Sequence, residues 1–199
     1  SITMSDELIQ YSAGVVIVRL NIALGLPTSA FSERYEVEAK LSTESTFSLI
    51  GGGTGLNYEF LNVISGSTYD VRAKAINSFG IESDYITSSH TVIGETAPPS
   101  NVTGFAVNII GDQAHLTWDA VPDLDLEFYI IRFSTATAGA DWNNSLDLVA
   151  QVARPATSIS VPAMVGSYLI TALDKSGHES ASKTIMVSTI AGITGLNLI

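Results

Sequence analysis

The sequence lacks cysteine and has few cationic residues. The absence of cysteine among 199 residues excludes a disulfide framework and any thiolate metal site. Nine Lys and Arg stand against 20 Asp and Glu, so the net charge is 9 − 20 = −11. The negative charge is spread evenly, at 5 − 11 = −6 over residues 1–95 and 4 − 9 = −5 over residues 96–199. Because such a surface repels phosphate and anionic headgroups, we expect neither nucleic acid nor a membrane as a partner.

Long apolar runs are also missing. One candidate, VVIVRLNIALGL, is interrupted by Arg19 and Asn21, and it falls short of the roughly 18–20 apolar residues of a membrane helix. No signal-peptide pattern begins at Ser1. The chain opens abruptly and closes on GITGLNLI, so we expect a piece of a longer protein. Apolar residues make up 46% and charged residues 15%, which suits buried cores rather than disorder.

A short motif occurs twice in the chain. ALDKSGHES at 172–180 matches AINSFGIES at 75–83, with Ala, Gly, Glu and Ser in the same four places. The copies lie 172 − 75 = 97 residues apart, and the landmarks Tyr35 and Tyr129 lie 129 − 35 = 94 apart. This period exceeds the roughly 20–50 residues of a solenoid repeat and fits a β-sandwich of about 100. We expect a first module at 1–95, a second at 96–191, and a linker or further domain starting at 192–199.

The apolar pattern has period 2 almost throughout, which predicts β-strands half buried against a core. Val16 to Ile22 and Tyr35 to Leu41 alternate in this way, whereas SDELIQYSAG has acidic residues in a possible first helical turn but is too short for a lone helix. Pro98 and Pro99 in GETAPPSNVTG predict a short, stiff connection. Further strands are predicted at 46–50, 56–61, 68–76, 84–93, 102–109, 113–118, 127–134, 146–153, 157–161, 167–173 and 183–189.

The repeated motif is predicted to be the turn into the last strand of each module. Gly80 and Gly177 would supply positive φ. Asn77 and Asp174 would bond the backbone two residues on, and Glu82 and Glu179 would open the last strand facing solvent.

The segment QAHLTWDAVPDLDLEFYIIRFST resembles the B and C strands of a fibronectin type III module. The resemblance implies two tandem seven-stranded antiparallel β-sandwiches, an all-β fold of the fibronectin type III or immunoglobulin-like kind, with Trp118 filling one core. LNVISGSTYDVRAKAIN is similar to the E to F corner, which implies that Leu61 packs inward and that Tyr69 is a corner tyrosine. The first module has no such Trp, so Leu20 or Ile22 is expected to take its volume.

The second module departs from this family pattern. Tyr168 falls two residues later than Tyr69 when the repeated turns are superposed, so no tyrosine corner is expected there. This variant, with ETAPPSNVTGF before it and Trp142 ahead of LDLVAQV, resembles the fibronectin type III modules in tail tip, host-specificity proteins of long-tailed bacteriophages.

The resemblance implies a non-enzymatic structural or interaction module pair in a virion, involved in host recognition and attachment. Its expected partners are other tail proteins and a bacterial surface receptor or glycan, and the parent protein is expected to be a homo-trimer. The alternative is an adhesion or glycan-binding accessory module of a bacterial surface protein or extracellular glycosidase, located outside the cell or at its surface.

Chemical motifs are weak. In an extended segment, Asp123, Asp125 and Glu127 would point to one side and could bind Ca²⁺, but the Gly and later Glu of an EF-hand loop are missing. GGGTG at 51–55 lacks the Lys of a phosphate-binding loop and is predicted to be a flexible hairpin loop. For Asp123, Asp125 and Glu127, the preferred interpretation is an acidic loop that enters a strand, because such a loop needs no metal.

Two candidate groups remain. His90, His115 and His178 are scattered, so no histidine site is expected. Trp142 could contact a sugar or a protein, but we favour the alternative in which it folds back over a sheet edge. The sequence therefore predicts no catalytic residue, no cofactor and no metal site.

Overall fold

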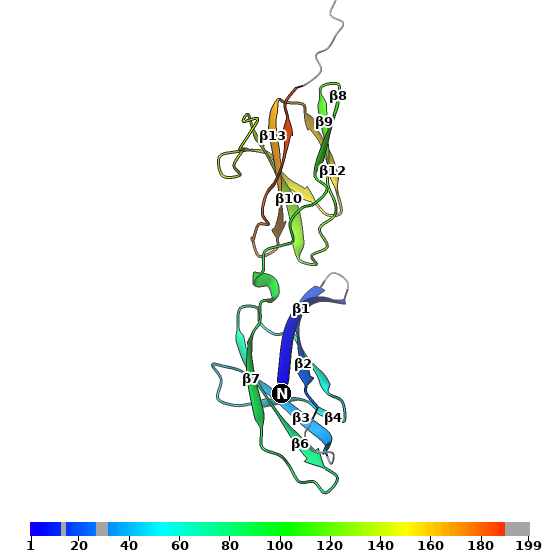
Figure 1. Cartoon of the computed structure of the whole chain (residues 1–199), viewed down its shortest axis with the longest axis vertical. Helices are drawn as coiled ribbons and strands as arrows, with labels where there is room; N and C mark the ends of the chain where they lie inside the picture. The colour runs from blue at the N-terminus through cyan, green and yellow to red at the C-terminus, as the bar shows by residue number, and fades with distance from the viewer. Residues whose placement is uncertain (13–14, 27–31, 190–199) are drawn as a thin grey trace, which may run out of the picture. The chain divides into compact units, whose positions relative to one another are not determined.

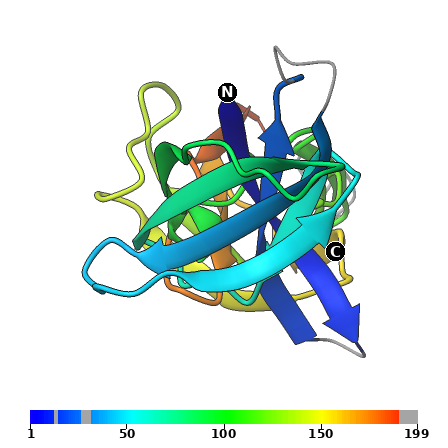
Figure 2. The ribbon, with the colours of Figure 1, turned by 90° about the horizontal axis from the view of Figure 1, so that it is seen from below.

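The computed structural model describes residues 1–12, 15–26 and 32–189, and these form two all-β units (Figures 1 and 2). The units are Ser1–Ala97 and Pro98–Ile199, here called module 1 and module 2. The expected segment at 192–199 lies outside the described residues. Within the described ranges no helix is long and apolar enough to span a membrane.

Module 1 is a sandwich of two antiparallel sheets, ordered β1-β2-β5 and β4-β3-β6-β7. A 3₁₀ turn, η1 (Gly94–Thr96), follows the last strand. The strands are β1 (Ile2–Ser12), β2 (Val15–Leu24), β3 (Ser32–Leu41), β4 (Ser48–Gly53), β5 (Asn57–Leu61), β6 (Thr68–Asn77) and β7 (Ile86–Thr91).

Module 2 has the same plan, with sheets ordered β12-β9-β8 and β11-β10-β13-β14. Each strand occupies the place of the strand seven earlier in module 1, so the predicted pair of seven-stranded sandwiches is confirmed. The strands are β8 (Ala106–Ile110), β9 (Gln113–Thr117), β10 (Leu126–Ser134), β11 (Leu146–Ala153), β12 (Ser158–Pro162), β13 (Gly166–Asp174) and β14 (Lys183–Val187).

As predicted, different side chains fill the cores of the two modules. In module 2, Trp118 is 5% exposed and meets Tyr129 edge to face, with ring centroids 5.2 Å apart. In module 1, Leu20 and Ile22 are 0% and 2% exposed and take the central place. Edge-to-face pairing adds to the gain from burial alone, so module 2 has the more aromatic core.

The repeated motif forms the same turn twice, and its shared residues explain why. The N–H of Ala75 donates to Ser83 Oγ, and that of Ala172 to Ser180 Oγ, each at 2.9 Å. The shared glycines have φ of 78° at Gly80 and 88° at Gly177, as predicted, a conformation that disfavours a side chain. The copies of ALDKSGHES therefore mark a common backbone geometry.

The polar residue that opens this turn acts differently in the two copies. Asn77 Oδ1 accepts from the N–H of Phe79, two residues on, and from that of Ile81. Asp174 instead accepts from the N–H of His178, four residues on, at 2.8 Å. The prediction is therefore confirmed for Asn77 and wrong for Asp174.

The first strand was missed in the sequence. SDELIQY lies within β1, which pairs with β2 along nearly its whole length. The predicted loop GGGTG is also wrong in part, because Gly51, Gly52 and Gly53 are paired residues of β4. A Cβ on Gly51 would lie 2.7 Å from the Tyr58 ring. Gly51 therefore makes room for a neighbouring ring.

Two predictions about the corner residues are wrong. Leu61 is 40% exposed and lies opposite Arg19, while its neighbour Phe60 packs edge to face on Tyr69. Module 2 does have a tyrosine corner: Tyr168 Oη accepts from Met164 N at 2.8 Å and donates to Pro162 O at 3.0 Å. A shift of two residues keeps a strand side chain on the same face, and the shorter loop brings the backbone to it.

Candidate functional site

The acidic segment of module 2 does not form the predicted row of carboxylates. A turn at 124–125 precedes β10, so the segment is not extended. Asp125 is 5% exposed, whereas Glu127 is exposed to solvent. Asp123 accepts the N–H of Ser100 at 3.1 Å. The three carboxylates therefore face different surroundings, and no cluster of three metal-binding side chains is found within the described residues.

Asp125 and Asp174 are nevertheless an unusual buried pair. Asp174 is 1% exposed, and both its oxygens interact with His178, through the backbone N–H and the ring Nδ1. Burial raises the pKa of the Asp125 carboxyl, and repulsion from Asp174 and Asp123 adds to the effect. Burial and the neighbouring carboxylates thus disfavour the negative charge of Asp125 at this place.

The three histidines lie on different elements and each has its own partner. His90 Nε2 lies 2.6 Å from Asp6 Oδ1, His115 Nδ1 lies 3.1 Å from Ser160 Oγ, and His178 contacts Asp174. They lie on β7, on β9 and in the turn after β13. A histidine-centred site would need such side chains to converge, whereas within module 2 His115 and His178 bond to separate partners.

Trp142 folds back onto its own sheet, as the favoured alternative predicted, but it lies over Arg132 on the interior strand β10 and not over the sheet edge. The guanidinium of Arg132 lies 4.3 Å from the centre of the Trp142 ring, and its Nη1 donates to the Trp142 carbonyl at 3.0 Å. The indole Nε1 donates to Glu179 at 2.8 Å. One ring face and the polar edge are therefore already occupied, which leaves less of the ring for a sugar.

The outer face of the four-stranded sheet in module 1 carries a charged aromatic cluster that the sequence did not reveal. Arg72 lies between two rings, with its guanidinium 4.2 Å from the centre of Phe47 and 4.1 Å from that of Tyr85. Across the sheet, Arg72 pairs with Glu38, and Lys74 pairs with Glu36 at 3.1 Å. The alternation of Glu36, Glu38 and Lys40 was the available signal, because cross-strand neighbours of opposite charge stabilise a sheet.

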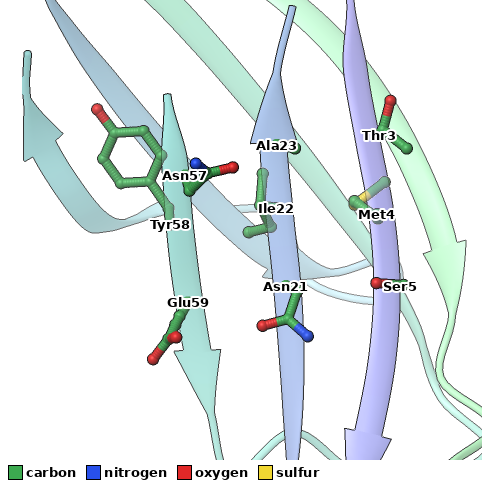
Figure 3. A pocket seen from close by; sticks show the side chains of 9 residues that line it. All are labelled: Thr3, Met4, Ser5, Asn21, Ile22, Ala23, Asn57, Tyr58 and Glu59. Carbon is green, nitrogen blue, oxygen red and sulfur yellow. The ribbon is translucent and has the colours of Figure 1, made fainter. Parts of the chain in front are cut away.

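A shallow pocket of about 300 Å³ lies on the outer side of the β1-β2-β5 sheet (Figure 3). Ala23 lies opposite Thr3 and Asn57, and Asn21 lies opposite Ser5 and Glu59. Met4, Ile22 and Tyr58 also line it, but their side chains pack against the core. The outward groups supply hydroxyls, amides and one carboxylate, so the pocket could form hydrogen bonds with a ligand rich in hydroxyl groups.

Large apolar side chains are exposed on the repeated turn of module 1. Phe79 is 86% exposed and Ile81 is 66% exposed. Module 2 has Ser176 and His178 at these two places and forms the same turn. The turn therefore does not need the apolar side chains.

The known proteins that resemble this chain are solved structures. No protein-family model matches the chain, and no curated protein matches it. The FN1-FN3 domains of chicken contactin are similar at 19% identity and a TM-score of 0.38, over 86% of this chain and 63% of that one. A two-domain fibronectin type III segment of chicken tenascin is similar at 15% identity and a TM-score of 0.38, over 95% of this chain and 100% of that one. This chain thus spans 63% of the length of the contactin structure, and both neighbours are tandem fibronectin type III domains.

Proposed function

We propose that the chain is a non-enzymatic structural and interaction module pair of a phage tail tip or central tail fibre protein. The observation that carries the proposal is that the chemically active side chains neutralise one another within their own module. Arg72 is enclosed by Phe47, Tyr85 and Glu38, and Trp142 is held by Arg132 and Glu179. Catalysis needs titratable groups that converge on an open site, and these networks instead stabilise sheet faces.

The phage assignment rests on the sequence variant. It combines the connection ETAPPSNVTGF with Trp142 and the repeated turn ALDKSGHES. The proposed location is the distal end of a virion tail, where the modules space and support the apparatus that contacts the host. The proposed partners are neighbouring tail proteins and a bacterial surface receptor or glycan, in a parent protein that is a homo-trimer.

The reading frame around this chain and labelling of the particle test the proposal together. We expect hub and coiled-coil segments in the same frame, and we expect antibodies raised against the purified chain to label the tail end of intact phage particles. An antibody depleted on the purified chain is the matched control. A catalytic domain or cell-wall anchor in the same frame would exclude the tail assignment, as would label confined to bacterial cells.

Glycan binding by an accessory module is a second candidate, favoured by the hydroxyl and amide groups of the pocket in Figure 3. Binding of the chain to a glycan array would support it if Asn57→Ala abolished the signal while Trp142→Ala did not. Asn57 lines the pocket, and Trp142 is the aromatic candidate in the other module. No binding to any glycan of the array would remove this candidate.

A further inference from the structure

Asp6 occupies a position in β1 that should hold an apolar side chain. Its neighbours at two residues' distance, Met4 and Leu8, pack against the core of module 1, so alternation places Asp6 on the same side. The Asp6 side chain is only 7% exposed. A buried carboxylate is costly unless it is paired, so its partners explain why it is tolerated.

The partners of Asp6 all come from the end of module 1. Oδ1 lies 2.6 Å from Nε2 of His90 on β7, and Oδ2 accepts from the N–H groups of Ile93 at 3.1 Å and Gly94 at 2.8 Å. Burial by itself raises the pKa of Asp6, but the bonds from His90, Gly94 and Ile93 together outweigh it, and the pKa lies below its usual value. The carboxylate therefore stays charged at neutral pH and joins the first strand to the segment that leaves the module.

The segment after β7, residues 93–96, has few other anchors. Glu95 N donates to Ser65 Oγ at 3.0 Å, whereas the bond from Thr96 Oγ1 to the Ile93 carbonyl, at 2.7 Å, stays within the segment. Gly94 has a φ of 51°, and a Cβ there would lie 2.3 Å from Ser65 Oγ. The close fit at Gly94 makes the segment sensitive to a small change.

Module 2 forms the same sandwich without this arrangement. Its first strand, β8, has the sequence AVNII, and its partly buried Val107 and Ile109 pack against the core. The polar link in module 2 joins Asn101 Oδ1 to Ala181 N at 3.0 Å, ahead of β8. The Asp6 arrangement is therefore not a requirement of the fold.

We propose that Asp6 is a clasp that couples the docking of β1 to the ordering of residues 93–96, so that the two segments are held or released together. β1 is an edge strand, hydrogen-bonded to β2 alone among the strands of its sheet, and it runs beside β7 (Figure 1). The clasp gives it a second attachment, through Asp6 to His90 of the other sheet and to the backbone that follows β7. This inference goes beyond the proposed function, because it holds whatever partner the modules have.

Amide hydrogen exchange on the whole chain tests the coupling. In Asp6→Ala we expect at least about tenfold faster exchange both in β1 and at Ile93 and Gly94, because each lost hydrogen bond is worth roughly a factor of five. Exchange in module 2 should not change. Ser5→Ala, at an exposed position on the outward side of the same strand, is the matched control and should affect neither segment. Faster exchange in one segment alone, or in neither, overturns the proposal.

A double-mutant cycle separates coupling from simple destabilisation. Gly94→Ala strains residues 93–96 directly. If the two segments are coupled, Gly94→Ala speeds amide exchange in β1 when Asp6 is present, and it has no such effect in the Asp6→Ala background. If Asp6→Ala prevents module 1 from folding, Asp6→Asn replaces it, since the amide keeps one acceptor oxygen and loses the charge. Equal effects of Gly94→Ala on β1 in both backgrounds would refute the clasp.

Discussion

The outer faces of the two four-stranded sheets are covered in different ways, although the sheets share one strand order. In module 1, cross-strand ion pairs and two aromatic rings cover β3 and β6. In module 2, the outward residues Ser167, Leu169 and Thr171 of β13 are 2%, 0% and 1% exposed. The loop before β11 contacts the first of them, since Ser167 Oγ donates to the Ala136 carbonyl at 2.8 Å.

One element of this cover is nevertheless common to both modules. The loop before β4 places Phe47 over Arg72, and the loop before β11 places Trp142 over Arg132, at 4.2 and 4.3 Å. The arginines are on different strands, β6 and β10, so the likeness is invisible in an alignment. Cation–π contacts of this kind contribute about 0.5–1 kcal/mol at exposed sites. The comparison teaches that an aromatic residue in this loop serves the sheet beneath it.

The core substitution with the largest expected effect is Trp118→Ala. We expect it to destabilise module 2 by about 4 kcal/mol, since a cavity forms beside Tyr129, and Leu20→Ala to destabilise module 1 by about 3 kcal/mol. Both tryptophans lie in module 2, so in Trp118→Ala the fluorescence of Trp142 still follows its urea transition. Leu20→Ala should leave that transition in place, and an equal shift would mean that the modules unfold as one.

The tyrosine corners offer the next comparison. Tyr168 is 0% exposed, and its hydroxyl both accepts from Met164 N and donates to Pro162 O, whereas the Tyr69 hydroxyl accepts from Ile64 N at 3.1 Å. We expect Tyr168→Phe to cost about 2 kcal/mol and Tyr69→Phe about 1 kcal/mol, because each lost buried bond costs roughly 1. Urea denaturation followed by circular dichroism measures both. A larger loss in Tyr69→Phe would reverse the ranking.

The fold could be predicted because most strands follow the period-2 pattern, and the exceptions have local causes. β1 was missed because Asp6 occupies an inward position, which breaks the apolar alternation of Ile2, Met4 and Leu8. The three consecutive glycines of β4 resembled a loop, although the first of them, Gly51, is small because it lies against the Tyr58 ring. In both places a contact between distant segments outweighs the local signal.

The candidate site residues were harder to predict, because their surroundings depend on loop paths. Asp123 and Asp125 have the spacing of a shared face only if the segment is extended, and a turn intervenes. The correct interpretation of Trp142 as a cover for its own sheet needed no partner residue, but Arg132 and Glu179 could not be named from it. Residues far apart in sequence meet through loops, and period alone does not reveal such contacts.

The two modules should respond to acid in opposite ways. Asp125 in module 2 has a raised pKa, caused first by burial, so the folded state binds a proton before the unfolded state does. The stability that this group contributes therefore rises as the pH falls from neutral towards 4. In module 1, Asp6 and Asp70 have lowered pKa values, and their contribution is lost below the usual value of 3.8.

Asp125→Asn isolates the contribution of Asp125 to the pH dependence of the stability of module 2. We expect it to raise the stability of module 2 at pH 7 by about 1 kcal/mol, the usual scale of an improved charge arrangement, and to abolish the rise between pH 7 and 4. Urea titrations followed by Trp fluorescence at several pH values measure this. Glu127→Gln, at an exposed residue two positions further along the chain, is the matched control. A variant less stable than the wild type at pH 7 would show that the charge of Asp125 is favourable.

The smallest expected effect comes from replacing the two exposed apolar side chains of the repeated turn in module 1 by the residue types that module 2 has there. Because Ser176 and His178 support the same turn in module 2, Phe79→Ser with Ile81→His should change the stability of module 1 by less than about 0.5 kcal/mol. Gly80→Ala is the matched contrast: its φ of 78° disfavours a Cβ, and we expect a loss of about 1 kcal/mol or more. Thermal unfolding of both variants distinguishes a turn stabilised by its backbone geometry from one stabilised by the side chains of Phe79 and Ile81. A loss in the double variant as large as that in Gly80→Ala would mean that Phe79 and Ile81 pack against module 1 despite their exposure.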